Sequence, residues 1–218
     1  MLIKVCGMSS PEKIGKFPSL SANLMGLIFY PKSKRYVEAG LYGSETEVID
    51  ALETVRRSGV KLVGVFVDES VETISFFASK YSLDYIQLHG NETPEFANEI
   101  KSLGFSVIKA IPVSGLEDIE SLSDGWQGVA DYLLFDYKCA EKGGSGKKFD
   151  WSVLSAYTGA TPFVLSGGIG PDDAGDILSL NHERFAGVDL NSKFEIAPGL
   201  KDLDSLSKFI NELRAKIK

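Results

Sequence analysis

The sequence predicts a (β/α)8 barrel, the TIM-barrel architecture, and three observations lead to this prediction. Eight short apolar runs, rich in β-branched residues, recur along the 218 residues. The runs are nearly continuous rather than alternating, which is typical of parallel strands that are buried on both faces. Most segments between them can form amphipathic helices, and eight strand–helix units fit a barrel at the short end of its size range, about 200 to over 400 residues.

The predicted strands are residues 2–6, 24–29, 61–67, 84–89, 106–111, 131–136, 162–166 and 187–190. A doubly wound open sheet is the competing arrangement, and it usually has a Gly-x-Gly-x-x-Gly turn after its first strand. Here Cys6-Gly7-Met8-Ser9-Ser10 follows instead, with one glycine only. Because no linker or shift in composition divides the chain, residues 1–218 are expected to form a single domain.

The clearest predicted helix covers residues 45–57, where apolar side chains recur on one face, with Ser44 as N-cap and Gly59 as stop. Similar patterns predict helices over 70–80, 93–102 and 202–217. Weaker patterns predict helices over 11–20, 116–122, 150–157 and 172–180. The sequence Phe17-Pro18-Ser19 interrupts the first of these weaker segments.

Composition and charge exclude several classes of protein. Hydrophobic residues make up 44% of the chain and charged residues 24%, as in ordinary globular proteins. The net charge of −7, without a basic block, argues against nucleic-acid binding. Neither a secretion signal nor an apolar run near the ~20 residues of a membrane span is visible. With two cysteines only, the chain is expected in the reducing cytoplasm. It is expected to be a monomer or homodimer, without membrane or nucleic-acid partners.

A barrel gathers the carboxyl ends of its strands into one mouth, where TIM-barrel active sites lie. Polar and titratable side chains stand at these positions along the whole sequence. They are Cys6, residues 30–35, Asp68, His89, Asp136, Ser166 and Asp189. The sequence therefore predicts one polar site assembled from residues far apart in the chain.

Two glycine-rich stretches and one polar turn late in the chain suggest a phosphate site. They are residues 143–147, 166–170 and the turn 189–192. Glycine lets backbone N–H groups converge on an anion, although any single stretch is more often only a tight turn. Two consecutive stretches after strands seven and eight, where barrels often bind phosphate, favour the functional interpretation. Residues 143–147 lack the spacing of a P-loop.

Cys6 and Asp136 are candidates for proton transfer. A cysteine in a strand is usually an inert small hydrophobe, but at the mouth, beside Lys4 or Arg35, its pKa could be lowered and the thiol could act as a base. Asp136 after three apolar residues is either a cap for the next loop or a functional acid. Arg35 belongs to a basic loop that is either solvated or an anion receptor. With His89 as the one histidine in reach, a multi-ligand metal site is not supported.

Several motifs, taken together and in order, carry a family resemblance. They are Lys4-Val5-Cys6-Gly7-Met8, residues 29–36, Val63-Gly64-Val65-Phe66-Val67, Gln87-Leu88-His89-Gly90, Asp136, residues 143–151, Leu165-Ser166-Gly167-Gly168-Ile169 and Asp189-Leu190-Asn191-Ser192. Each motif is weak alone, but their joint order from strand one to strand eight resembles the phosphoribosylanthranilate isomerases of tryptophan biosynthesis.

The resemblance implies a (β/α)8 barrel that catalyses an Amadori rearrangement, the third step from chorismate to L-tryptophan. It implies that Cys6 is the general base, Asp136 the general acid and Arg35 the contact for the anthranilate carboxylate. It implies further substrate contacts at Gln87, His89, Gly144, Gly146, Ser166, Gly167, Gly168, Asp189, Asn191 and Ser192. The amine of the phosphorylated substrate supplies the electron sink, so no metal or other cofactor is implied.

The chain departs from the family pattern at one site position, because Lys193 stands where a glycine commonly follows the serine of the strand-eight turn. Two other functions stay open at this point. One is a different phosphosugar isomerase on the same scaffold, although such enzymes typically use an early aspartate or lysine rather than Cys6. The other is a phosphate-binding module without catalysis.

Overall fold

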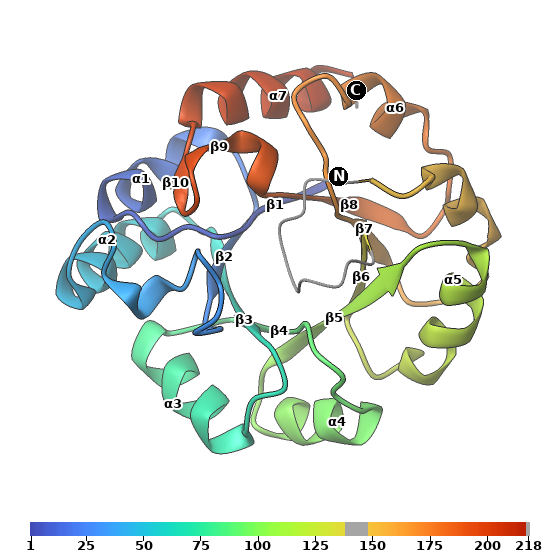
Figure 1. The fold of residues 1–218 in the computed structure, drawn as a ribbon, viewed down its shortest axis with the longest axis horizontal. Helices are drawn as coiled ribbons and strands as arrows, with labels where there is room; N and C mark the ends of the chain where they lie inside the picture. Colours follow the sequence, from blue (N-terminus) through green and yellow to red (C-terminus); the bar gives the residue numbers. More distant parts are fainter. Residues whose placement is uncertain (138–147, 217–218) are drawn as a thin grey trace.

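The computed structural model describes residues 1–137 and 148–216 and contains a closed barrel of eight parallel strands (Figure 1). The strands pair in chain order, and β1 closes the ring by pairing with β8. Their bounds are β1 (Leu2–Val5), β2 (Leu24–Ile28), β3 (Lys61–Phe66), β4 (Tyr85–Leu88), β5 (Ser106–Val113), β6 (Tyr132–Tyr137), β7 (Phe163–Leu165) and β8 (Phe185–Leu190). The predicted barrel and all eight predicted strands are confirmed.

Each strand divides its side chains between two apolar layers, because successive side chains point to opposite faces. One layer fills the barrel and consists of Leu24, Val63, Ile108, Ala110, Leu134 and Val164. The other faces the surrounding helices and is much larger. Both faces of the sheet therefore pack against apolar side chains, which explains why the strands appear in the sequence as continuous apolar runs.

Four predicted helices lie within a few residues of the predicted bounds: α2 (Glu45–Arg57), α3 (Val71–Tyr81), α4 (Pro94–Ser102) and α7 (Leu203–Ala215). At the start of α2, Ser44 Oγ accepts a hydrogen bond from the Glu47 N–H, and the Glu47 carboxylate accepts one from the Ser44 N–H. This reciprocal capping box satisfies two backbone donors that the first turn would otherwise leave unpaired.

The weaker helical patterns gave short or tighter elements. Two are α-helices, α5 (Leu116–Ser123) and α6 (Ala174–Ser179). Short 3₁₀ turns that were not predicted form at η2 (Val37–Ala39) and, directly after α5, at η3 (Asp124–Trp126). The segment 11–20 divides into α1 (Pro11–Lys16) and the 3₁₀ turn η1 (Phe17–Leu20), where Pro18 lacks the N–H of a continuing helix. The α-helix predicted over 150–157 is wrong in type, because η4 (Trp151–Ala156) is a 3₁₀ helix.

A small antiparallel hairpin between β8 and α7 was not predicted. After the 3₁₀ turn η5 (Ser192–Phe194), β9 (Glu195–Ala197) pairs with β10 (Leu200–Lys201). Pro198 and Gly199 make the turn, and Gly199 has a φ of +84°, which glycine adopts without strain. In Figure 1 this hairpin lies between α7 and α1, beside the β1 edge of the barrel.

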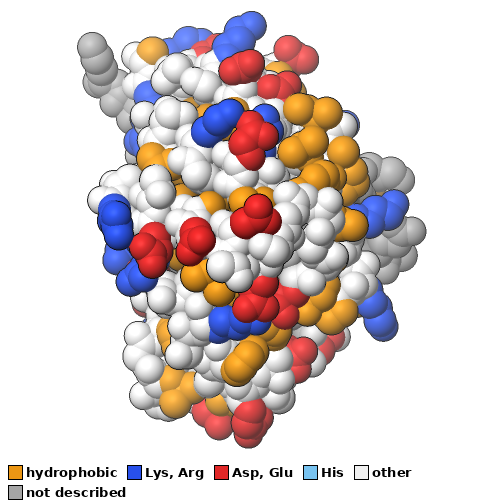
Figure 2. Space-filling model, turned by 90° about the vertical axis from the view of Figure 1, so that its left-hand side faces the viewer, with side chains coloured by type: hydrophobic (Ala, Val, Ile, Leu, Met, Phe, Trp, Pro, Cys, Tyr) orange, Lys and Arg blue, Asp and Glu red, His pale blue; other side chains and the backbone are white. Residues whose placement is uncertain are grey.

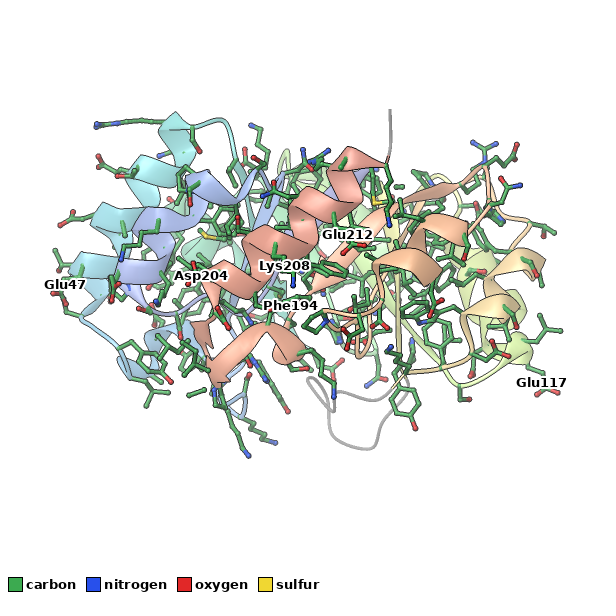
Figure 3. All side chains as sticks on the ribbon, turned by 90° about the horizontal axis from the view of Figure 1, so that it is seen from above. Glu47, Glu117, Phe194, Asp204, Lys208 and Glu212 are labelled. Carbon is green, nitrogen blue, oxygen red and sulfur yellow. The ribbon has the colours of Figure 1, made fainter. Side chains whose placement is uncertain are left out.

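The outer surface carries mixed charges. Figure 2 shows acidic and basic side chains interspersed on the side of the molecule that bears α1 and α2, without a broad field of either sign. Along α7, the exposed residues Asp204, Lys208 and Glu212 follow one face at four-residue spacing (Figure 3). Within the described ranges, no helix is both long and apolar enough to cross a lipid bilayer.

At the amino end of the barrel, the same arrangement satisfies a backbone N–H group near the start of β1, β3 and β5. The residue just before an even strand turns its side-chain oxygen to the neighbouring odd strand and accepts a hydrogen bond from a backbone N–H. The pairs are Asn23 with Ile3, Asp84 with Leu62 and Asp131 with Val107, at 2.7–2.9 Å. Because this end lies opposite the mouth, these three side chains serve the stability of the barrel rather than the site.

Asp131→Ala is expected to lower the free energy of unfolding by about 1–3 kcal/mol, because the Val107 N–H loses its acceptor. Urea unfolding followed by circular dichroism measures this loss. Arg57→Ala, which removes only an exposed ion pair with Glu53, is the control and should change the same quantity by less than about 1 kcal/mol. Equal losses in the two variants would contradict the structural role of Asp131.

Candidate active site

A lysine and an aspartate lie next to each other inside the barrel, below the mouth. Lys4 of β1 and Asp189 of β8 are register partners, and Lys4 Nζ lies 2.9 Å from Asp189 Oδ1. Burial alone would lower the pKa of Lys4, but the charge of Asp189 and then that of Cys6 outweigh burial and leave this pKa raised. Lys4 is therefore an ammonium ion in the barrel interior.

Cys6 follows β1 and lies on the same inner face as Lys4, two residues further toward the mouth. Its side chain is buried, and Gly26 of β2 makes room for the sulfur, since a Cβ on Gly26 would lie 2.6 Å from Sγ. Burial raises the pKa of the Cys6 thiol, Lys4 opposes the rise and Asp189 adds to it. The net direction is upward, opposite to the lowering that a nearby cation would cause by itself.

Asp136, near the end of β6, is half-buried and in contact with His89. His89 Nε2 lies 3.3 Å from Asp136 Oδ2, and the Tyr137 N–H donates to Asp136 Oδ1 at 2.8 Å. The other ring nitrogen of His89 lies 2.8 Å from Gln87 Nε2, so with this amide orientation His89 carries its proton on Nε2 and donates it toward Asp136. Gln87 thus orients the ring from below.

Asp189 connects these two groups electrostatically. Its charge acts on Cys6, and the charge of Asp136 acts on Asp189, whose own pKa is raised by burial and lowered to a lesser extent by Lys4. Ser166, just after β7, donates a hydrogen bond to Asp189 at 3.4 Å. Since β1 and β6 are three strands apart in the closed ring, Cys6 and Asp136 approach the mouth from different sides.

The turn after β7 provides backbone donors beside Asp136. Gly167 and Gly168 both have positive φ values, +87° and +68°, and a Cβ on Gly167 would lie 2.9 Å from Asp136 Oδ1. In the described part of the chain, the N–H groups of Gly167, Gly168 and Ile169 have no hydrogen-bond acceptor. Adjacent glycines with unpaired N–H groups make a concave anion site.

The β8 turn lies against the β7 turn. Asn191 and Ser192 begin η5, and a Cβ on Gly170 would lie 3.8 Å from the Cβ of Lys193. The exposed Lys193 keeps a φ outside the left-handed region, so its backbone does not require the glycine that is common there in the family. The substitution therefore adds a positive charge without straining the turn.

Arg35, predicted to bind a carboxylate, is held by a residue that the sequence analysis missed. Glu195 at the start of β9 accepts hydrogen bonds from Arg35 Nε and Nη2 at 2.6–3.0 Å, and it also binds the buried Lys201 of β10. The Pro198-Gly199 turn signal between Glu195 and Lys201 could have revealed the hairpin. The pairing with Arg35, 160 residues earlier, leaves no signal in the sequence.

Two predicted contacts, Gly144 and Gly146, lie outside the described residues, as do Cys139 and Lys147. Among the described residues, no group of three or more His, Cys, Asp or Glu side chains could hold a metal ion. The remaining predicted residues surround the carboxyl end of the barrel, where they present a thiol, a carboxyl group, a cationic arm and two turns of backbone donors.

Comparison with known proteins identifies the family. A family model for N-(5'phosphoribosyl)anthranilate (PRA) isomerase matches residues 3–212. The chain belongs to this family. It is 48% identical to the N-(5'-phosphoribosyl)anthranilate isomerase of Parabacteroides distasonis, over 98% of this chain and 93% of that protein. It is 45% identical to the isomerase of Phocaeicola vulgatus, over the full length of both.

Solved structures of the family have the same barrel. The phosphoribosyl anthranilate isomerase of Thermotoga maritima is 34% identical, with a TM-score of 0.79 over 99% of this chain and 100% of that one. Another structure of the isomerase, in complex with reduced 1-(o-carboxyphenylamino)-1-deoxyribulose 5-phosphate, is 31% identical, with a TM-score of 0.77 and the same coverage. Family and fold thus agree over nearly the whole chain, which is an isomerase of this family.

Native Cys6 should ionise at a higher pH than Cys6 in the unfolded chain, because burial raises the pKa of its thiol. The rate of alkylation by iodoacetamide, followed by mass spectrometry between pH 6 and about 10, measures this difference. Cys139→Ser protein in native buffer and in urea isolates the Cys6 signal. A native midpoint at or below the unfolded midpoint would show that Lys4 outweighs burial.

Proposed function

We propose that this isomerase converts N-(5-phosphoribosyl)anthranilate into 1-(2-carboxyphenylamino)-1-deoxy-D-ribulose 5-phosphate, with Cys6 as general base and Asp136 as general acid. The main support is that Cys6 and Asp136 reach one barrel mouth around Asp189, with Arg35 and the glycine turns also at this end. The relative bound to the reduced carboxyphenylamino-deoxyribulose phosphate supports this class of substrate. The reaction is the third step from chorismate to L-tryptophan.

Asp136 acts first in this proposal. Its protonated carboxyl group gives a proton to the furanose ring oxygen, the C1–O bond breaks, and the anthranilate nitrogen becomes a cationic Schiff base. His89 then donates a hydrogen bond to the carboxylate that is left behind, from the 3.3 Å contact already present. Because the electron pair of the substrate's amine drives ring opening, this step uses only groups of the protein and the substrate.

Cys6 acts second. Its thiolate removes the proton on ribose carbon 2, which the cationic Schiff base acidifies, and the resulting enolamine tautomerises to the ketone. Lys4 lies close enough for its charge to stabilise the thiolate that Cys6 must become. A thiol with a raised pKa is seldom ionised, but its thiolate is a stronger base, so burial has opposite effects on the amount and the strength of the base.

The two anionic ends of the substrate have separate receptors in this proposal. Arg35 binds the anthranilate carboxylate with its planar fork, and the turns at Gly167-Gly168 and Asn191-Ser192 bind the phosphate through backbone N–H groups. Gln87, His89, Ser166 and Asp189 are the proposed contacts between them. Gly144 and Gly146, outside the described residues, are proposed as further substrate contacts. This division fixes the ribose between the base and the acid.

We further propose that residues 1–218 act as one domain, in the cytoplasm, as a monomer or homodimer. The pairing of β1 with β8 supports the single domain, because it ties the two ends of the chain into one sheet. The phosphorylated substrate supports the location, since a sugar phosphate does not cross a membrane unaided. Light scattering on the purified protein decides between one copy and two.

Cys6→Ala and Asp136→Asn are each expected to lower kcat by roughly 10²–10⁴-fold, the usual contribution of a general base or acid. The loss of phosphoribosylanthranilate fluorescence, with purified protein and no added cofactor, measures turnover. Asp131→Ala, a carboxylate change at the opposite end of the barrel, is the control and should keep kcat near that of the wild type. Near-normal turnover in Cys6→Ala would refute the assignment of Cys6 as the general base.

Lys193→Ala is expected to raise KM by a few-fold at low salt, with kcat nearly unchanged, because it removes one exposed positive charge beside the phosphate turns. Competitive inhibition by inorganic phosphate should weaken in parallel, and both effects should fade as salt is added. A changed kcat with an unchanged KM would place Lys193 outside phosphate binding.

A further inference from the structure

The guanidinium group of Arg35 has one edge bound within the protein and one edge left for a ligand. A guanidinium ion has two edges that can each bind a carboxylate through two N–H groups. Glu195 takes the edge formed by Nε and Nη2, with hydrogen bonds of 2.9 and 3.0 Å from Nε and 2.6 Å from Nη2. Among the described residues, none accepts a hydrogen bond from Nη1. The outer edge, Nη1 with the second Nη2 hydrogen, is therefore the one left for a ligand.

Glu195 is itself a buried charge that needs a second cation. Lys201 supplies it, since Lys201 Nζ lies 2.6 Å from Glu195 Oε1 and the lysine is completely buried. Burial would raise the pKa of Glu195, but Arg35 and Lys201 outweigh burial and lower this pKa. Glu195 is thus ionised, and the triad of Arg35, Glu195 and Lys201 keeps a net charge of +1 while Lys201 is protonated.

Lys201 also connects the triad to the phosphate turn. Its Nζ donates to Asn191 Oδ1 at 2.7 Å and lies 3.3 Å from the Asn191 carbonyl oxygen. Gly7, next to Cys6, packs between the two receptors, because a Cβ there would lie 2.8 Å from both Arg35 Cδ and Asn191 Oδ1. With its φ of +74°, Gly7 allows this approach and fixes the distance between the cationic arm and the β8 turn.

The hairpin that carries Glu195 and Lys201 is firmly anchored. Phe194, just before Glu195, is buried and packs on Phe209 of α7 with ring centres 5.0 Å apart, as its place against α7 in Figure 3 shows. In the turn, Glu195 accepts a hydrogen bond from the Gly199 N–H, and Ser9 Oγ donates one to the Gly199 carbonyl. A side chain on so fixed a support can hold an arginine in one orientation.

We propose that Glu195 is a positioning residue that determines specificity: with Lys201 as its counter-charge, it holds Arg35 so that the Nη1–Nη2 edge meets the carboxylate of the substrate. Arg35 alone is a flexible arm, and fixing it in advance removes an entropic cost of binding. The acid and base do not touch this edge, so Glu195 acts mainly on recognition; it reaches Cys6 only indirectly, through the charge of Lys201. The inference rests on the proposed function, and it deepens the assignment of Arg35.

The test compares two phosphoribosyl adducts, one of anthranilate and one of aniline, which lacks the carboxylate. Glu195→Gln should raise KM for the anthranilate adduct roughly tenfold or more, since hydrogen bonds to charged groups contribute about 1.5–3 kcal/mol. The kcat for this adduct should change less than about threefold. For the aniline adduct, which does not use Arg35, the variant and the wild type should have similar kcat/KM values.

A double-mutant cycle with Arg35→Ala separates positioning from general damage. Once Arg35 is absent, Glu195→Gln should add less than about twofold to KM for the anthranilate adduct. Glu53→Gln, which removes a carboxylate from an exposed glutamate–arginine pair on α2, is the matched control and should leave both substrates unaffected. If Glu195→Gln does not fold, Glu195→Asp keeps the charge, shortens the arm and should give the same KM effect.

Three outcomes would overturn the inference: equal losses on the two adducts, a fall in kcat with KM unchanged, or additive effects of the Arg35 and Glu195 changes. Wild-type protein that does not turn over the anthranilate adduct would instead refute the proposed function. The wild-type assay therefore comes first. If the wild type is active but the effects of the Arg35 and Glu195 changes on KM simply add, only the role of Glu195 is rejected.

Discussion

A buried lysine and aspartate, side by side on β1 and β8, set the electrostatics of the whole barrel mouth. Removing two charges from water is costly, and replacement of a buried ion pair by apolar side chains often stabilises a protein. Apolar side chains in place of Lys4 and Asp189 would therefore stabilise the barrel about as well as this ion pair does. The value of the ion pair lies in position, because Lys4 acts on Cys6 while Asp189 interacts with both Cys6 and Asp136.

The same arrangement recurs around the mouth, where a side chain of the candidate site is held by a partner residue. Gln87 orients His89, Ser166 contacts Asp189, and Glu195 holds Arg35. The loop after β4 has its own support in a second buried ion pair, in which Glu92 lies 2.7 Å from Lys109 and accepts a hydrogen bond from the Gly90 N–H. Chemistry on a small sugar needs such fixed geometry, since small displacements of reacting groups lower rates steeply.

Glycines give these groups the space to approach each other. Gly26 makes room for the sulfur of Cys6. Gly167 allows the turn after β7 to pack against Asp136, and Gly7 allows Arg35 and Asn191 to pack close to each other. The barrel thus separates two tasks: its apolar strands and amino-end caps supply stability, while its carboxyl end carries groups whose burial and close packing cost stability. Active sites commonly show this division, because polar groups must be desolvated to act on a substrate.

The sequence by itself determined the eight strands, the main helices and the order of the candidate residues, because each depends on local patterns: apolar runs for strands, amphipathic spacing and caps for helices, glycine turns after strands. It missed the 3₁₀ form of η4 and the hairpin of β9 and β10, whose short segments carry weak local signals. Only the tertiary structure decided that Glu195 binds Arg35, and that burial outweighs the charge of Lys4 in setting the pKa of the Cys6 thiol. Such pairings and desolvation depend on which distant segments the closed ring brings together, and no local pattern encodes that.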